Sequence, residues 1–242
     1  MRVSLRNLIL LNKGRSRTTP TLFFCRGGSR TALAFILLAL LSACKPIPPP
    51  TLFGSISEVD DRDYDRTFAQ WTRHAKLYNV LDNVLFASST FHAPQFRRAF
   101  GLKFPDIYGH GGEVTRRELV DLSSDAETFH TFLLKAYTPD LKWNDLDRAD
   151  SIWRITLTNP DQNITVQAAQ ISRVKIDANL KAVYGYLGDF DRAYLVRFPL
   201  IDPTDKLVIE PHTTKFVMRI ASALGTTQMT WDLTPSKIAD LP

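Results

Sequence analysis

The side chains that could bind a metal ion or transfer protons are few and scattered in this 242-residue chain. The histidines are His74, His92, His110, His130 and His212. No two of them have the i, i+4 spacing that places two ligands on one helical face, and no His-Glu-x-x-His motif occurs. The run His110-Gly111-Gly112-Glu113 could form a small loop site with a ligand from elsewhere, although such a run is more often a turn. His130 falls within a predicted strand, where a structural or surface role is expected. The histidines therefore predict no metal site.

Oxygen ligands are concentrated in one stretch between two predicted strands. They are Asp140, Asn144, Asp145, Asp147 and Asp150. Hard oxygen ligands in a loop suit calcium. However, Ala149 occupies the position of a third oxygen ligand of an EF-hand, and the glycine and distal glutamate of that motif are missing. Arg148 also neutralises part of the charge. A calcium-dependent adhesion module is therefore an alternative and not the main prediction.

Motifs for covalent catalysis or nucleotide binding do not occur. There is no Gly-x-Ser-x-Gly elbow, and the run 185–188 lacks the lysine and the glycine spacing of a phosphate loop. Carboxylate pairs for glycoside hydrolysis are assembled in space and cannot be recognised among 25 acids. A hydrolase therefore stays an alternative, with no catalytic residue or cofactor predicted. Four clustered aromatic residues could stack on a sugar or peptide, but core residues at strand ends are the more common explanation: Tyr184, Tyr186, Phe190 and Tyr194.

The second of the two cysteines follows a segment typical of export. Residues 31–41 are uncharged and apolar, and they follow Arg26 and Arg30. This run is shorter than the ~20 residues needed to span a bilayer, so it fits the apolar region of a signal peptide. The next residues, Leu41-Ser42-Ala43-Cys44, resemble the lipobox of bacterial lipoproteins: an aliphatic residue, two small residues and a cysteine.

The resemblance implies a lipid anchor at Cys44. In that family the thiol receives a diacylglycerol, the preceding peptide bond is cut, and the new amino group is usually acylated, often with palmitate. Residues 1–43 would then be a signal peptide and 44–56 a proline-rich tether. Lys45, in place of the aspartate that retains lipoproteins in the inner membrane of enteric bacteria, favours the outer membrane, with the domain facing the periplasm. The remaining chain is similar in kind to uncharacterised envelope lipoproteins of Gram-negative bacteria, a likeness that implies no activity.

The formal charge of +5 comes from the predicted leader. Seven basic residues and no acid lie within 1–43, which leaves 23 basic and 25 acidic residues in the rest of the chain. The mature protein is therefore expected to be slightly acidic. This balance argues against nucleic acid as a partner, because nucleic-acid binding relies on clustered positive charge.

The elements that must position any site fall into two regions. Residues 57–127 are predicted to hold helices and one strand: an apolar stripe at Tyr64, Phe68 and Trp71 indicates a helix, 79–91 favours a strand, and 94–100 and 113–122 favour helices. Residues 128–235 are predicted to form a β-sandwich. Its expected strands are 129–137, 151–158, 164–171, 193–199, 206–210, 215–221 and 226–233.

The strand prediction rests on the alternation of apolar and polar residues along the chain. Trp153, Ile155 and Leu157 should point to one face, and Met229 and Trp231 repeat the pattern. Half-buried strands separated by turns are typical of an antiparallel sandwich. The predicted fold class is mainly β with α (α+β), a single domain over 57–235 followed by a tail at 236–242. It is immunoglobulin-like in architecture only, because the Cys…Trp…Cys spacing of antibody domains is missing.

These observations predict a lipid-anchored envelope protein that works by binding or scaffolding, with a protein of the envelope as a possible partner. A periplasmic hydrolase and a calcium-dependent adhesion module are the alternatives.

Overall fold

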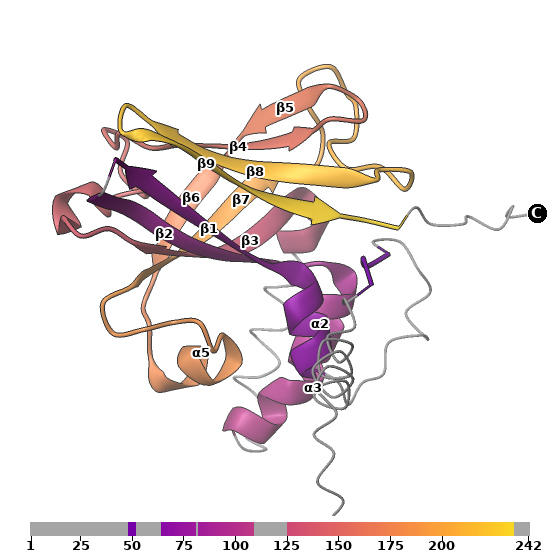
Figure 1. Ribbon diagram of the computed structural model, residues 1–242. Coiled ribbons are helices and arrows are strands. Elements are labelled where there is room, and N and C mark those ends of the chain that lie inside the picture. The colour runs from indigo at the N-terminus through magenta and orange to yellow at the C-terminus, as the bar shows by residue number, and fades with distance from the viewer. Residues whose placement is uncertain (1–47, 52–63, 81, 109–124, 235–242) are drawn as a thin grey trace, which may run out of the picture. The chain divides into compact units, whose positions relative to one another are not determined.

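A computed structural model of the protein describes residues 48–51, 64–80, 82–108 and 125–234. The chain divides into two units, 1–46 and 47–242, and all described residues lie in the second. This unit contains two antiparallel sheets with helices near one end (Figure 1), which confirms the predicted α+β sandwich. The predicted lipobox, the run 110–113, the predicted helix 113–122 and the predicted tail lie outside the described residues.

The two sheets are built from nine strands in the described part of the chain. These are β1 (Thr72–Asn79), β2 (Asp82–Phe91), β3 (Phe129–Tyr137), β4 (Arg154–Asn159), β5 (Ile164–Gln167), β6 (Gln170–Val174), β7 (Arg192–Pro199), β8 (Lys215–Ser222) and β9 (Gly225–Asp232). The first sheet has the order β1-β2-β3-β7-β6, and the second has the order β5-β4-β8-β9. The described helices are α2 (Tyr64–Trp71), α3 (Pro94–Tyr108), α5 (Ala178–Val183) and the short 3-10 helix η2 (Leu141–Trp143).

Aromatic side chains join the two sheets face to face. Phe132 on β3 lies 5.4 Å from Trp231 on β9, measured between ring centroids, and Phe91 on β2 lies 5.2 Å from Phe216 on β8. All four side chains are buried. Burying large apolar side chains between two alternating sheets is the main favourable contribution to this fold.

The predicted alternation is confirmed in the second sheet. Trp153, Ile155 and Leu157 are buried, and Met229 and Trp231 repeat the pattern from β9. The first of these, Trp153, precedes β4, so this strand begins three residues later than expected. The strands β4 and β5 pair antiparallel as a hairpin, with Asn159 opposite Ile164.

Hydrogen bonds from side chains join the edge strands β1 and β9 of the two sheets. Arg73 Nε donates to the Thr230 carbonyl at 2.8 Å, and Thr227 Oγ1 donates to the Lys76 carbonyl at 3.2 Å. These contacts cover two edges that would otherwise offer backbone groups to another strand. The strand β1 was not among the predicted elements.

At the side of the sandwich opposite β1 and β9, the predicted strand 164–171 is wrong. The segment 164–171 does not form one strand but two, β5 and β6, which belong to different sheets. The crossing is at Ala168 and Ala169, whose amides donate to Ile155 at 3.1 Å and to Arg197 at 2.8 Å. A short side chain at each position lets the chain pass between sheets while its backbone donors stay satisfied.

The predicted strand 206–210 is also wrong. These residues form part of the loop from β7 to β8, with one isolated bridge between Ile201 and Leu207. The loop is shaped by Asp202, whose carboxylate accepts hydrogen bonds from the amides of Thr204 and Lys206, each at 2.9 Å. Local side-chain bonds of this kind compete with strand pairing. Val208 and Ile209 are buried nonetheless, which explains the apolar pattern.

Helices α2 and α3 form the predicted helical region. Tyr64 and Trp71 of α2 are buried, with Phe68 packed against the core, as the apolar stripe predicts. Pro94 occupies the first turn of α3, where its missing amide hydrogen costs nothing, and the helix continues to Tyr108, beyond the expected end at residue 100. The helix α5 was not predicted.

The segment before the domain is held against it. Thr234 donates to the Pro50 carbonyl at 2.9 Å through its amide and to the Pro49 carbonyl at 3.1 Å through its hydroxyl. Gln95, at the start of α3, donates to the Thr51 carbonyl. Pro50 is buried. The described part of the proline-rich segment therefore docks between the end of β9 and the start of α3.

Candidate functional site

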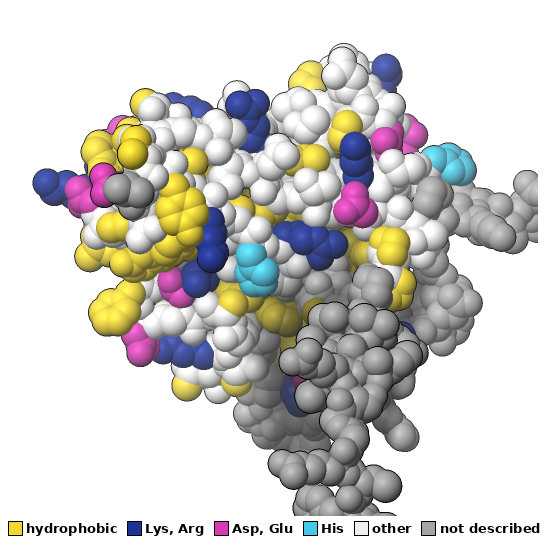
Figure 2. All heavy atoms as spheres, viewed as in Figure 1, with side chains coloured by type: hydrophobic (Ala, Val, Ile, Leu, Met, Phe, Trp, Pro, Cys, Tyr) yellow, Lys and Arg dark blue, Asp and Glu magenta, His cyan; other side chains and the backbone are white. Residues whose placement is uncertain are grey.

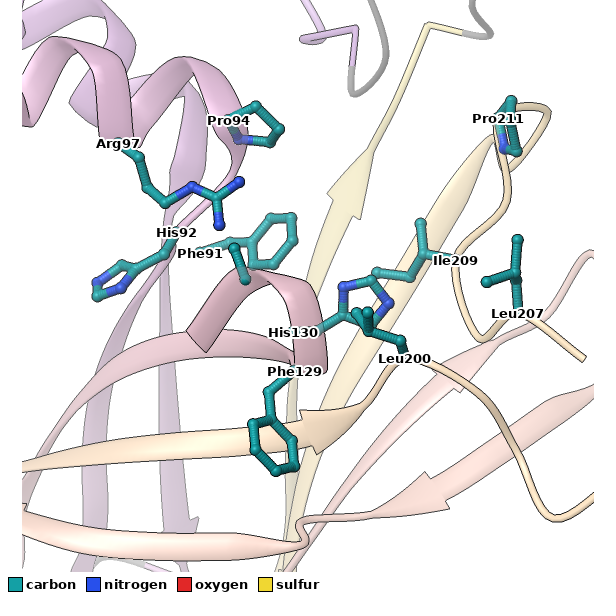
Figure 3. Close-up of a pocket in the computed structure, with 11 residues that line it drawn as sticks. Phe91, His92, Pro94, Arg97, Phe129, His130, Leu200, Leu207, Ile209 and Pro211 are labelled. Atoms are coloured by element: carbon teal, nitrogen blue, oxygen red, sulfur yellow. The ribbon is translucent and has the colours of Figure 1, made fainter. Parts of the chain in front are cut away.

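A cavity of about 260 Å³ lies at one end of the sandwich (Figure 3). Its walls come from four places: the end of β2 and start of α3, a helical turn at 125–128, the start of β3, and the loop from β7 to β8. The described residues that line it are Phe91, His92, Pro94, Arg97, Ala126, Phe129, His130, Leu200, Leu207, Ile209 and Pro211. Eight of these are apolar and three carry nitrogen bases, and no carboxylate is among them.

The strand register explains why these residues meet. Phe91 pairs with Phe132, and the His92 amide donates to the Thr131 carbonyl at 2.9 Å, so the end of β2 lies beside the start of β3. The loop from β7 then crosses from the first sheet to the second at this same end. Apolar residues that cap the core, such as Ile209, also form one wall of the cavity.

Arg97 contributes the fixed positive charge of the cavity. It extends from α3 towards Phe91 (Figure 3), and its side chain is partly buried. Burial lowers the pKa of the guanidinium, although arginine stays protonated in proteins. Within the described ranges no acidic side chain forms an ion pair with Arg97.

Two buried histidines lie close to this charge. Burial, and secondarily the charge of Arg97, lowers the pKa of His92 to about 3 and that of His130 to about 4. Both imidazoles are therefore neutral at pH 7, and each offers one donor and one acceptor nitrogen. His92 uses Nε2 in a 2.9 Å hydrogen bond with the Tyr184 hydroxyl. His92 Nδ1 and His130 Nε2 are buried and have no hydrogen-bond partner within the described part of the chain.

Among the described lining residues, no pair is arranged for nucleophilic catalysis. The described lining contains neither a serine nor a cysteine that the histidines could activate, and it contains no acid. An apolar cavity with a few convergent polar groups is the usual form of a small-molecule site.

Of the described histidines that the sequence singled out, His92 and His130 line the cavity, whereas His74 and His212 do not. His130 was expected to be structural or on the surface, and it lies in the wall of the cavity, with its ring 6.0 Å from that of Phe91. His74 is on β1, where Nδ1 is 2.8 Å from Ser88 Oγ. His212 lies in the loop before β8 and is exposed. His110 lies outside the described residues.

The acids considered for calcium do not converge on one point. Asp147 pairs with Arg173 at 2.8 Å, and Asp150 pairs with Arg148 at 2.9 Å. Asp145 accepts a hydrogen bond from Ser151. Among the residues described, no three histidine, cysteine or acidic side chains lie close enough together to hold a metal ion.

The remaining polar residues of that loop are also engaged within the protein. Asp140 caps the helix η2 by accepting from the amide of Lys142 at 2.9 Å. Asn144 is buried, donates to the Ala136 carbonyl at 2.9 Å and accepts from the Tyr194 hydroxyl at 2.9 Å. The polar side chains of this loop therefore stabilise its conformation and its contacts with the first sheet.

The four clustered aromatic residues do not form a platform. Tyr184 and Tyr194 are buried, and Tyr186 is hydrogen-bonded to Thr90 at 3.0 Å. Phe190 is 82% exposed and lies apart from them. The expectation of a role in the core holds for the tyrosines and not for Phe190.

Apolar side chains are also exposed at the end of the first sheet that is opposite the cavity. They include Tyr78, Val80, Leu141 and Phe190, and a shallow groove of about 500 Å³ lies beside the last two. Basic and acidic side chains are interspersed across the face shown in Figure 2.

No protein family, no curated protein and no solved structure matches this chain. Within the described residues, no helix is both long enough and apolar enough to cross a membrane. Function is therefore inferred from the cysteine motif and from the cavity.

Proposed function

We propose that the protein is a lipoprotein of the bacterial cell envelope that works by binding, with the cavity as its site for a small apolar ligand. Cys44 would carry the lipid, and the domain would face the periplasm from the outer membrane. The observation that supports the binding function is the cavity itself: eight apolar side chains and three nitrogen-containing side chains line an open cavity of about 260 Å³.

The motif Leu41-Ser42-Ala43-Cys44 supports the anchor. Cys44 precedes Pro50 by six positions, and a chain spans at most ~3.6 Å per residue. Lipid on Cys44 would then hold the docked residue Pro50 within about 20 Å of the headgroups. Two or three acyl chains, at ~0.8 kcal/mol per buried CH₂, would make this attachment permanent in practice.

Replacing each cysteine in turn tests the anchor. Cys44→Ala should abolish incorporation of labelled palmitate, leave the leader uncut and release the chain from the membrane fraction. Cys25→Ala is the matched control, because it removes the other cysteine, which lies upstream of the proposed cleavage site. Palmitate incorporation that survives Cys44→Ala, or an unmodified Cys44 thiol in the native protein, would refute the proposal.

The binding function is tested with 1-octanol, a neutral apolar probe of the size of the cavity. Binding is measured by calorimetry on the full chain carrying Cys44→Ala, which lacks the lipid. Leu207→Gln removes an apolar wall that is about half buried, so the affinity should fall about fivefold, for a loss of ~1 kcal/mol. Leu102→Gln is the matched control: Leu102 and Leu207 are both 45% exposed, but Leu102 lies on α3 outside the lining. Equal losses in both variants, or no octanol binding, would contradict a binding role for the cavity.

A further inference from the structure

Arg97 is partly buried in the wall of the cavity without an acidic partner within the described ranges. A guanidinium loses hydration when it is buried, and proteins usually compensate for that loss with a carboxylate or phosphate. The apolar side chains around Arg97 offer no such group. An anion in the cavity would provide it.

A second arginine near the cavity, Arg197, is also largely buried, but it has a carboxylate partner. Arg197 on β7 lies close enough to influence the pKa of His92, and it pairs with Asp125 at 2.7 Å. Asp125 is thereby engaged, although it is adjacent in sequence to the lining residue Ala126. Asp125 neutralises Arg197, whereas no carboxylate in the described ranges neutralises Arg97, which lines the cavity.

A second feature also points to a polar ligand group. The buried Nε2 atom of His130 has no hydrogen-bond partner in the described structure, and its ring lies in the cavity wall next to Ile209 (Figure 3). An unsatisfied buried polar atom costs free energy, so native proteins rarely contain one without a reason. The acidic head of a ligand, which has two or three oxygens, would offer an acceptor to each of these two groups.

We propose that the cavity binds an anionic amphiphile with a single short aliphatic chain. Its acidic head would accept hydrogen bonds from the guanidinium of Arg97 and from His130, and its chain would lie along Phe91, Leu200 and Ile209. A volume of about 260 Å³ corresponds to eight or nine methylene-sized groups, at ~30 Å³ each, the share of a water molecule. This inference rests on the proposed binding function and specifies its ligand class.

The place of the cavity in the fold suggests where such a ligand comes from. Pro94 lines the cavity, and the next residue, Gln95, holds the docked segment at Thr51. If Cys44 is lipidated, this end of the domain lies near the membrane surface. Membranes offer single-chain anions of two kinds, fatty acids with a carboxylate head and single-chain phospholipids with a phosphate head. Arginine binds both heads through paired N–H groups.

Three eight-carbon probes with different heads test the inference: octanoate, octyl phosphate and 1-octanol. Calorimetry on the full chain carrying Cys44→Ala at neutral pH should show that at least one anion binds about tenfold more tightly than octanol, a difference of ~1.4 kcal/mol. The tighter anion identifies the head. Arg97→Gln should remove this preference and leave octanol binding within about twofold, while Arg97→Lys should retain part of it.

Control variants separate a ligand contact from a general structural effect. Arg98→Gln makes the same change one residue away, at an exposed position outside the described lining, and should retain the preference for the anion. His130→Phe keeps an aromatic ring but removes the nitrogens, and should weaken anion binding more than octanol binding. Thermal unfolding of each variant checks that the fold persists.

The outcomes distinguish this inference from the function on which it rests. Octanol binding without any preference for either anion overturns the inference and leaves an apolar binding site. The same holds if Arg97→Gln weakens all three probes equally. If no probe binds, both the inference and the binding function of the cavity fail, whereas the anchor at Cys44 is decided separately by palmitate incorporation.

Discussion

The buried histidines of the cavity should make the protein sensitive to mild acid. The pKa of His92 is lowered from 6.5 to about 3, and that of His130 from 6.5 to about 4, by burial and by the charge of Arg97. In the unfolded chain both imidazoles take up a proton near pH 6.5, whereas in the folded chain they stay neutral until much lower pH. Because the unfolded state then binds more protons, the free energy of unfolding decreases as the pH falls below 6.5.

The expected loss in the free energy of unfolding follows from the difference between the folded and unfolded pKa values of each histidine. Each histidine contributes about 1.4 kcal/mol per pH unit between its folded and unfolded pKa values. From pH 6.5 to pH 5 the loss is about 2 kcal/mol for each histidine, or about 4 kcal/mol for both. Small domains have ~5–15 kcal/mol in total, so this change is large. His74, whose pKa is also lowered by burial, acts in the same direction.

Urea unfolding followed by tryptophan fluorescence at pH 7, 6, 5.5 and 5 measures this effect. Aspartates with lowered pKa values, such as Asp161 and Asp202, contribute below this range, because their ordinary pKa is 3.8. The double variant His92→Gln, His130→Gln lacks both titrating groups and should lose most of the slope. A wild-type stability that is constant from pH 7 to pH 5, or a double variant with the wild-type slope, would refute the reasoning.

Three further substitutions test the fold by urea unfolding. Asn159 is fully buried, and its amide donates to a carbonyl and to a hydroxyl in the loop before β8. Asn159→Ala should therefore cost about 2–3 kcal/mol, and a loss below about half a kcal/mol would show that water replaces the amide. Gly225 has φ 135°, and a Cβ added at this position would lie 2.9 Å from Leu77 Cδ1, so Gly225→Ala should cost about 1–3 kcal/mol; an unchanged midpoint would contradict this strain. Trp231 Nε1 donates to the buried Trp71 carbonyl at 2.8 Å, and Trp231→Phe should cost at least ~1–3 kcal/mol because that carbonyl loses its donor. A Trp231→Phe chain as stable as the wild type would argue that this bond contributes nothing.

The strands could be predicted where their signal is local. Alternation at Trp153, Ile155 and Leu157 reflects one buried face, and this period-2 pattern needs no knowledge of the partner strand. The stripe in α2 is equally local. The segments 164–171 and 206–210 were mispredicted because an apolar pattern reports burial, which a crossing between sheets or a buried loop also produces.

The cavity could not be found in this way. His92, His130 and Ile209 are distant in sequence and meet only because β2 pairs with β3 and the loop from β7 crosses the same end. One signal was available: if the predicted strands 79–91 and 129–137 pair antiparallel, the end of one strand lies beside the start of the other, which brings His92 near His130. The absence of an acidic partner for Arg97 among the described residues had no signal in the sequence, because packing decides which acids lie within its reach.

The sequence by itself determined what is encoded by neighbouring residues: the strand alternation, the helical stripe of α2, and the motif at Cys44 that predicts a lipid anchor. Only the tertiary structure decided which strands share a sheet, where the chain crosses between sheets, and which side chains surround a cavity. The physical reason is the range of the interactions. Periodicity and motifs act over a few residues, whereas burial, ion pairing and pKa shifts depend on groups that folding brings together from distant positions.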